Sequence, residues 1–430
     1  MPPPLKSVRR SLLLALFLGP ALLLLGAIVV YPIGFTVIRS LYDRSGDGFV
    51  GFANYRLMLD LPEIATAIRN NVMWVVVAPG AVTALGLVLA VLTERIRWRT
   101  AFQVVLFMPM AISFLSAGVI WRLVYQRDPS LGLANAVVRA GVDLFRPPGP
   151  YSGARPSMPD LLSPEGDGFL SIRTYRPGGV AAFGLVAIPP SLLQNRAARA
   201  MPPRTTARSI QGVVWLDFSL GGGGKRGVID PSESGLPGVR VQALLGGRMV
   251  AEAVTGADGG FLLADLPPGE YRLRLDRASF HAPFDGIPWL GPTLVTPAII
   301  LSYIWIWAGF AMVVIGAGLA ALPREVLEAC RVDGASEWQI FRRVTVPLLA
   351  PALAVVFVTL VINVLKIFDL VLVIPPGSAL ANANVIALEM WRVSFGGIRN
   401  LGLGSALAVI LFLLVLPAMA LNARRFGRGA

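Results

Sequence analysis

Long apolar stretches dominate the pattern of hydrophobic and polar positions along the chain. Six of them approach or exceed the roughly 20 residues that a helix needs to cross the hydrocarbon core of a bilayer. These stretches are residues 12–38, 72–92, 102–120, 294–321, 353–374 and 401–421. The first is about twice as long as the apolar part of a signal peptide, so we expect an uncleaved anchor. The pattern therefore predicts an all-α polytopic membrane protein with six transmembrane helices.

A long segment between the third and fourth stretches breaks this pattern, because it is rich in Pro, Gly and Arg and has no run of spanning length. Within it, residues 239–243 and Tyr271–Leu275 alternate apolar and polar side chains, which is the period of a half-buried strand. Glycine and proline turns separate such segments at regular intervals. We expect an inserted extracytoplasmic β-sandwich over residues 209–276.

These patterns divide the chain into four parts. Residues 1–125 form an N-terminal transmembrane part with three helices, and residues 289–430 form a C-terminal transmembrane part with three more. Between them we expect an external linker and hairpin over residues 126–208, followed by the β-sandwich.

The distribution of basic residues predicts the orientation in the membrane. The composition, with 55% hydrophobic and 15% charged residues and a net charge of +13, is that of a membrane protein with some soluble material. One set of short loops holds thirteen basic residues and the opposite set holds six. The thirteen are Lys6, Arg9, Arg10, Arg95, Arg97, Arg99, Arg324, Arg331, Arg342, Arg343, Arg424, Arg425 and Arg428. The positive-inside rule then puts both termini in the cytoplasm of a cell-membrane protein, and the charge indicates no nucleic acid partner.

Candidate chemistry is sparse. The chain has one cysteine and one histidine, which removes most metal and nucleophile chemistry, and so we expect no enzyme. Residues 221–226 are glycine-rich, but Arg226 follows Gly224 and Lys225 where a phosphate-binding loop needs Ser or Thr. We therefore expect that this chain binds no cofactor and does not hydrolyse ATP itself.

A polar hairpin, residues 322–350, lies between the fourth and fifth apolar stretches. Gly334 suits the left-handed residue that ends a helix, and Ser336 with Gln339 fits a capping box at the start of the next helix. We expect Pro347 to end that second helix. The hairpin is therefore predicted to be a compact pair of helices on the cytoplasmic side.

This hairpin carries a resemblance to a known family. The segments Glu328-Ala329-Cys330 and Asp333-Gly334-Ala335 resemble the EAA loop in permease subunits of ABC importers, with Cys330 where a second alanine is usual. In that family the loop docks into a cleft of a separate ATPase subunit. The resemblance thus implies that Glu328, Ala329, Asp333, Gly334 and Ala335 couple the chain to ATP hydrolysis by a partner.

Other segments narrow the resemblance to the sugar branch of this family, of the maltose and α-glucoside type, and to the first of its two paired permeases. They are residues 49–55, 365–369 and 403–408, and the resemblance covers about residues 11–142 and 288–428. It implies the type I ABC importer permease fold, a second homologous permease, an ATPase dimer, an extracytoplasmic sugar-binding protein and alternating access in the lipid membrane. The alternatives are a permease for another solute, such as glycerol phosphate, and a membrane-anchored adhesin.

The fourth and fifth stretches offer candidate residues for the substrate pathway. Tyr303, Trp307 and Phe310 fall on one helical face, and Asn363 and Lys366 are one turn apart on the fifth stretch. Aromatic faces pack against sugar rings, and amide or ammonium groups bind hydroxyls. All of these residues except Trp307 match sugar-site positions of the family. Helix packing is the alternative role for the aromatic residues, and an ion pair of Lys366 with Asp369 is the alternative for the lysine.

The inserted segment resembles a different group, the prealbumin-like B repeats of bacterial surface adhesins. The resemblance rests on residues 212–217, 235–239, 256–261 and 266–271. Some of those repeats bind calcium in the loop after the first strand. Here that loop offers only Asp217, Asp230 and Glu233 as oxygen donors, so these are weak calcium candidates and we expect no other metal site.

Overall fold

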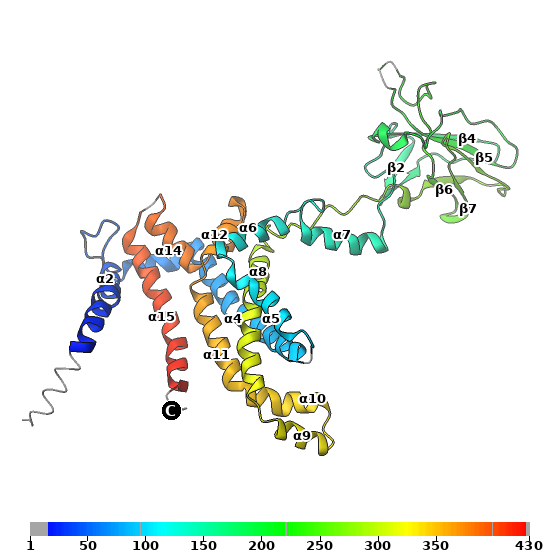
Figure 1. Cartoon of the computed structure of the whole chain (residues 1–430). Helices are drawn as coiled ribbons and strands as arrows, with labels where there is room; N and C mark the ends of the chain where they lie inside the picture. The colour runs from blue at the N-terminus through cyan, green and yellow to red at the C-terminus, as the bar shows by residue number, and fades with distance from the viewer. Residues whose placement is uncertain (1–15, 95, 220–221, 223, 398, 427–430) are drawn as a thin grey trace, which may run out of the picture. The chain divides into compact units, whose positions relative to one another are not determined.

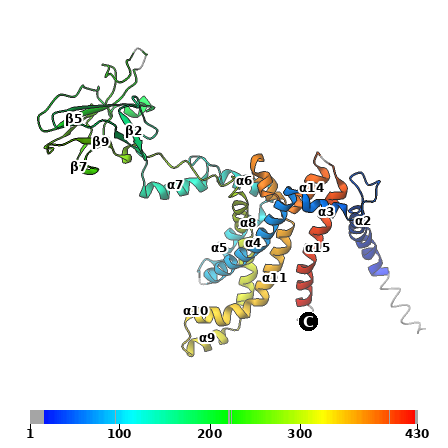
Figure 2. The ribbon, with the colours of Figure 1, turned by 180° about the vertical axis from the view of Figure 1, so that it is seen from behind.

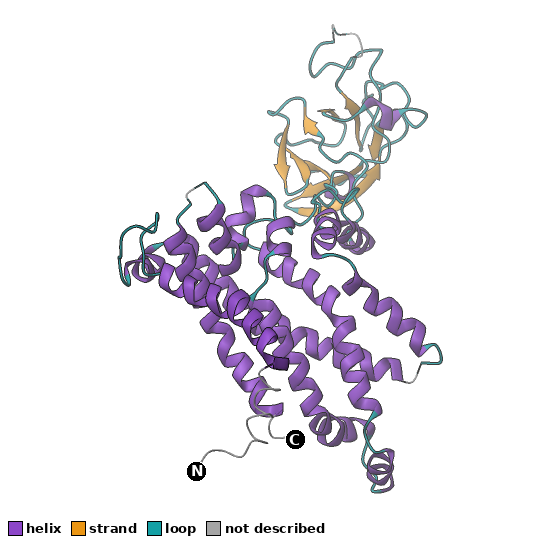
Figure 3. Ribbon diagram, turned by 60° about the vertical axis from the view of Figure 1, so that its left-hand side comes forward, coloured by secondary structure: helices purple, strands orange, loops and turns teal. Residues whose placement is uncertain are grey.

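The computed structural model describes residues 16–94, 96–219, 222, 224–397 and 399–426, with side chains to residue 417. The chain divides into two compact units. Met1–Arg127 and Pro288–Ala430 form the helical unit, and Asp128–Ile287 forms the β unit. All strands named below belong to the β unit, as the colouring by secondary structure shows (Figure 3).

The helical unit contains several apolar helices of membrane-spanning length. Within the described residues, four helices are long and apolar enough to cross a membrane: Leu16–Arg39, Pro62–Glu94 (α4), Val295–Ala320 (α8) and Glu337–Leu365. The last helix, α15, spans Leu401–Phe426, and its stretch Leu401–Pro417 is apolar. The segment Leu16–Arg39 includes a π-helical turn, Gly26–Val30, and α2, Tyr31–Arg39. The shorter helices α3, α12, α13 and α14 are Ala53–Asp60, Asp369–Val373, Leu380–Ala383 and Ile386–Phe395.

The third predicted span, residues 102–120, is not one straight helix. Helix α5, Arg99–Phe107, passes into a 3-10 turn, Met108–Ala111, and α6, Phe114–Val124, follows at a bend of 100°. Ile112 and Ser113 have extended backbone, and the Ser113 side chain caps α6 by accepting a hydrogen bond from Ser116 N at 3.2 Å. The break therefore follows from local capping chemistry that hydrophobicity alone does not show.

The fifth predicted span also has different bounds. Pro347 does not end a helix, because one helix runs from Glu337 to Leu365 through α10, Glu337–Ile340, a π-helical turn, Phe341–Thr345, and α11, Val346–Leu365. The π turn bonds Val346 N–H to the Phe341 carbonyl, so Pro347 begins a new α-helical stretch, where its missing N–H is tolerated. At the other end the helix stops at Leu365 rather than at residue 374.

Close packing joins α4 to α8 and α5 to α8. A Cβ atom added at Gly86 of α4 would overlap Ala311 of α8, and one added at Gly309 of α8 would overlap the carbonyl group of Leu106. Small residues at such crossings let helix backbones approach closely, which is a common way of packing helices in membranes. Glycine is thus the residue that both crossings require.

The two ends of the helical unit carry different features. The helices α9, Arg324–Val332, and α10 lie at the same end as the C-terminal end of α15 (Figure 1). Helix α14 lies at the opposite end, which the view from behind shows as well (Figure 2).

Buried polar groups near α14 hold this opposite end together. Asn70 of α4 donates hydrogen bonds from Nδ2 to the carbonyl oxygens of Asn382 and Asn384, at 2.7 and 2.8 Å. The neighbouring Asn71 accepts a hydrogen bond at Oδ1 from Ile386 N at 2.8 Å. Since these side chains are buried, they fix the α13–α14 segment to α4 with bonds that solvent does not compete for.

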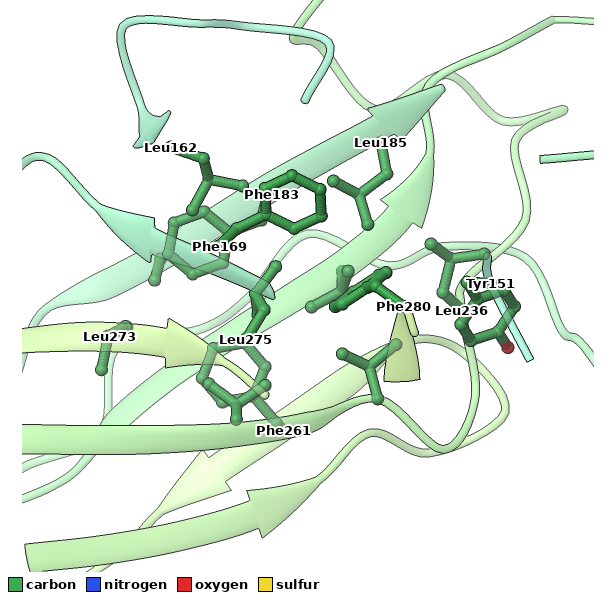
Figure 4. Packing of buried hydrophobic residues seen from close by; sticks show 14 of the residues in the cluster. Tyr151, Leu162, Phe169, Phe183, Leu185, Leu236, Phe261, Leu273, Leu275 and Phe280 are labelled. Atoms are coloured by element: carbon green, nitrogen blue, oxygen red, sulfur yellow. The ribbon is translucent and has the colours of Figure 1, made fainter. Parts of the chain in front are cut away.

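The β unit consists of helix α7, Leu133–Phe145, and two sheets. The four-stranded sheet has the order β1-β4-β5-β8 and the five-stranded sheet has the order β2-β3-β9-β6-β7. The strands β1 to β9 are Arg155–Pro156, Leu162–Glu165, Gly168–Ser171, Val180–Val186, Ile210–Leu216, Arg240–Leu245, Arg248–Val254, Gly260–Leu263 and Tyr271–Leu275. Apolar residues of both sheets meet in one buried cluster that includes Phe183, Phe261 and Leu273 (Figure 4).

The sheets extend further toward the N-terminus than the expected boundary at residue 209. Strand β4 pairs in parallel with β5, and β3 pairs with β9. Four strands therefore come from residues 126–208, where the sequence favoured a linker and a separate hairpin. The physical reason is that β4 is buried along most of its length and needs partners from the later strands to satisfy its backbone.

Candidate functional site

The turn between α9 and α10 has the backbone conformation that its sequence predicts. Gly334 has φ of +80°, in the left-handed region, and its N–H bonds to the Arg331 carbonyl at 3.0 Å. Ser336 Oγ accepts a hydrogen bond from Gln339 N at 3.3 Å, and Gln339 Oε1 accepts one from Ser336 N at 2.8 Å. The predicted capping box is confirmed. One helix thus ends and the next begins within a few residues.

An ion pair spans this turn. Arg331 Nε of α9 lies 2.8 Å from Glu337 Oε1 of α10, and the Glu337 carboxylate raises the pKa of the Arg331 guanidinium above its usual value. Both side chains are exposed, so the pair contributes little stability. Its geometric effect is to link the two helices on one side of the turn.

The five predicted coupling residues lie on the outer surface of this helix pair. Glu328, Ala329, Asp333 and Gly334 are exposed, and Ala335 is partly buried. Val332 is 88% exposed and Trp338 is 66% exposed, so the surface also presents large apolar side chains. The helix pair thus presents both polar and large apolar side chains on its surface.

Two hollows adjoin the helix pair. One, of about 580 Å³, is lined by residues of α4 and of the α9–α10 pair, including Val91, Leu327 and Trp338. The other, of about 320 Å³, is lined by residues that include Cys330, Gly334 and Arg343. Both hollows are thus lined in part by residues of the helix pair.

The three predicted aromatic pathway residues lie together, and the structure adds two more. Tyr303 and Trp307 have ring centroids 5.8 Å apart, and Trp307 meets Phe310 edge-on at 5.4 Å. Trp74 of α4 meets Tyr303 edge-on at 5.5 Å, and Phe114 of α6 stacks on Trp307 at 6.4 Å. We call these five residues the inner aromatic cluster. It joins α4, α6 and α8.

Three polar atoms of the inner aromatic cluster have no hydrogen-bond partner among the described residues. They are the indole Nε1 atoms of Trp74 and Trp307 and the hydroxyl of Tyr303, and all three residues are buried. An unpaired buried donor costs about 1–3 kcal/mol. Each unsatisfied buried group in a native structure calls for an explanation, such as a bound water or a ligand.

The polar residues of the fifth span do not form the ion pair that was the alternative role for Lys366. Asn363 is partly buried and donates to the Thr359 carbonyl at 2.9 Å. Lys366 is exposed and follows the end of α11, and no ion pair joins it to Asp369 in the described part of the chain. The reason is that Phe368 leaves helical geometry, with φ of −141° and ψ of −61°, so the i,i+3 spacing no longer places the two charges on one face.

The calcium candidates of the β unit hold their own loop together. Asp217 accepts a hydrogen bond from Gly227 N at 2.7 Å. Glu233 accepts one from Trp215 Nε1 at 3.0 Å and another from Asp230 N at 3.1 Å, and burial raises the pKa of its carboxyl. Within the described ranges, no group of three or more His, Cys, Asp or Glu side chains has the arrangement of a metal site.

Comparison with known proteins agrees with this architecture. Residues 249–424 match the family model of the binding-protein-dependent transport system inner membrane component. The osmoprotective compounds uptake permease protein of Synechocystis sp. is 29% identical over 412 residues, 96% of this chain and 98% of that protein. The alpha-glucoside transport system permease protein of Rhizobium meliloti is 28% identical over 417 residues, 96% of this chain and 82% of that protein.

A solved structure shows the same fold. A chain of a bacterial alginate ABC transporter, in complex with an alginate pentasaccharide-bound periplasmic protein, matches with a TM-score of 0.55 and 15% identity, over 97% of this chain and 96% of that one. The apolar helices, the α9–α10 pair and these matches define a polytopic membrane permease. Its homologues are ABC permease translocation subunits, not enzymes.

Sequence reasoning missed Trp74 and Phe114 as members of the inner aromatic cluster. Both lie within apolar stretches, where an aromatic residue is ordinary, so no local signal singled them out. It also gave no structural role to Asn70 and Asn71, whose partners lie more than 300 positions further along the chain.

Proposed function

We propose that this chain is one of two permease subunits of an ATP-driven importer for sugars, and that its substrates are α-glucosides or oligosaccharides. The observation that carries this proposal is the exposed α9–α10 pair, which is placed directly between the membrane helices α8 and α11. A polar helix pair in that position gives a separate ATPase subunit a surface to bind. Movement of the ATPase can then be transmitted to both α8 and α11. The relatives named above support the same conclusion.

The proposed arrangement in the membrane has six spans. The bent pair α5–α6 counts as one, and α15 is the last. The α9–α10 pair and both termini face the cytoplasm of the inner membrane, which agrees with the excess of basic residues in the short loops on that side. The β unit is then extracytoplasmic and, with its two sheets around one core, a β-sandwich.

The proposed complex contains a second homologous permease, two ATPase subunits and an extracytoplasmic sugar-binding protein. The alginate transporter that shares this fold is described with a sugar-bound periplasmic protein, which supports the last of these partners. ATP binding closes the ATPase dimer, the α9–α10 pair carries this movement to α8 and α11, and the central pathway opens outward. This chain itself supplies no cofactor site in this scheme.

Inside the membrane, Tyr303, Trp307, Phe310 and Asn363 are the proposed contacts of the sugar. Ring faces pack against the apolar faces of a sugar, and unpaired N–H and O–H groups bind its oxygens. Lys366, which is exposed, offers a charged donor at the end of α11. A second candidate substrate is a small osmoprotective compound, which the name of the Synechocystis relative favours.

The test is transport in proteoliposomes that contain the complete complex. We expect labelled maltose or trehalose to accumulate only with internal ATP and external binding protein. Unlabelled sugars and unlabelled osmoprotective solutes are added as competitors in separate reactions. The class of competitor that suppresses uptake of the labelled sugar identifies the class of substrate. Uptake that needs neither ATP nor binding protein would contradict the proposal.

A further inference from the structure

Trp74 is the one member of the inner aromatic cluster that α4 contributes. Its side chain is fully buried, and its ring lies at 87° to that of Tyr303. This contact joins residues 229 positions apart in the chain. Trp74 is therefore held in a defined orientation beside Tyr303.

The polar atoms of these three residues are hydrogen-bond donors without partners in the part of the chain that the structure describes. Trp74 and Trp307 can only donate through their indole N–H groups, whereas the Tyr303 hydroxyl can donate and accept. The helix backbones around them use their carbonyl groups within the helices. A ligand that fits this set offers several oxygen acceptors and an apolar face for the rings, which is the chemistry of a sugar.

We propose that Trp74 is a specificity-determining residue of the transport pathway, and that its indole N–H donates a hydrogen bond to one sugar oxygen. Tyr303 and Trp307 supply the neighbouring donors and ring faces. This inference rests on the proposed function, because it takes the transported solute to be a sugar. It adds α4 to the helices that contact the solute.

Trp121 of α6 provides a matched control. Its Nε1 is also buried and without a partner among the described residues, but its ring packs on Tyr125 at 5.1 Å and on Trp305 at 5.6 Å. None of these three belongs to the inner aromatic cluster. Trp121→Phe thus removes the same N–H group from a different aromatic environment.

The experiment compares sugars within each variant. The complete complex, reconstituted with binding protein and ATP, is given maltose and a series of monodeoxymaltoses, each of which lacks one hydroxyl. The measured quantity is the ratio of maltose uptake to deoxymaltose uptake. A lower amount of folded complex reduces both uptake rates equally, so it cancels in this ratio. The selectivity of the binding protein is the same for variant and parent, so it cancels when their ratios are compared.

We expect Trp74→Phe to lower the preference for maltose over one particular deoxymaltose by about 2- to 10-fold, the value of one hydrogen bond. Trp121→Phe should leave every ratio unchanged. Equal ratios for Trp74→Phe and the parent with all sugars would overturn the assignment of Trp74 while leaving sugar transport intact. A parent complex that transports none of these sugars would instead overturn the proposed function, and the assignment with it.

Discussion

The turn at Gly334 offers the sharpest perturbation of energy coupling. Its φ of +80° is a conformation that side chains disfavour, yet a Cβ atom added there would meet no atom within 4 Å. Gly334→Ala therefore adds no clash and tests the backbone conformation alone. Gly334→Pro goes further, because proline cannot reach a positive φ and removes the N–H that bonds to the Arg331 carbonyl at 3.0 Å.

The expected magnitude follows from the cost of the left-handed conformation, about 1–2 kcal/mol for a residue with a Cβ atom. This energy changes the balance between the observed turn and other arrangements by about 5- to 30-fold. Asparagine enters the left-handed region more readily than alanine. We therefore expect uptake to decrease in the order Gly334, Gly334→Asn, Gly334→Ala, Gly334→Pro, with the proline variant inactive.

The assay measures sugar uptake and binding-protein-stimulated ATPase activity in the same proteoliposomes, normalised to the amount of assembled complex. Membrane insertion should be equal for all four proteins, because the turn lies outside the apolar helices. Glu328→Lys, which reverses an exposed charge on α9, should also abolish uptake without loss of insertion. Uptake at the parent level by Gly334→Pro would refute the argument that this turn couples the chain to the ATPase. An equal loss of uptake in Gly334→Asn and Gly334→Pro would refute the argument that the left-handed conformation is what matters.

Three further predictions concern the substrate pathway and the β unit. Asn363→Ala should reduce uptake about 2- to 10-fold at subsaturating sugar through the loss of one hydrogen bond, while stimulated ATPase activity persists; unchanged uptake would mean that Asn363 only packs. Asp128–Ile287 expressed alone should unfold cooperatively, and a disordered chain would contradict the division into units. Because burial raises the pKa of Glu233 above 4.5, this carboxyl stabilises the β unit below that pH, and the contribution is lost as the pH rises through the raised pKa. Glu233→Gln should remove this part of the pH dependence of the melting temperature, and an identical dependence in both proteins would contradict the burial argument.

Local signals explain why the α9–α10 pair could be predicted. Gly334 ends one helix, and Ser336 with Gln339 begins the next, all within neighbouring residues. Such chemistry acts over one turn of helix and is visible in the sequence. The length of the second helix was not visible in the sequence. It depends on the π-helical turn before Pro347, which follows from how the whole segment packs.

Contacts between distant parts of the chain could not be predicted in the same way. The meeting of Trp74 with Tyr303, the parallel pairing of β4 with β5 and the bonds of Asn70 to the α13–α14 segment all join residues that no periodic pattern relates. The separation of Lys366 from Asp369 is a related case. Spacing of three residues implies proximity only while the helix continues, and here it ends at Leu365.

Cross-linking at Val332 tests the coupling role of the α9–α10 pair most directly. Val332 is 88% exposed on α9, and replacement of Cys330, the single cysteine of the chain, by alanine gives a background for Val332→Cys. Val228→Cys, at a 55% exposed position of the β unit, is the matched control. A short cross-linker with one thiol-reactive end and one photoreactive end, attached at position 332, should link it to an ATPase subunit in the assembled complex on irradiation. The yield should change when ATP binds, and position 228 should give no such product. An assembled, transporting complex in which position 332 reacts freely but never links to the ATPase would contradict the account.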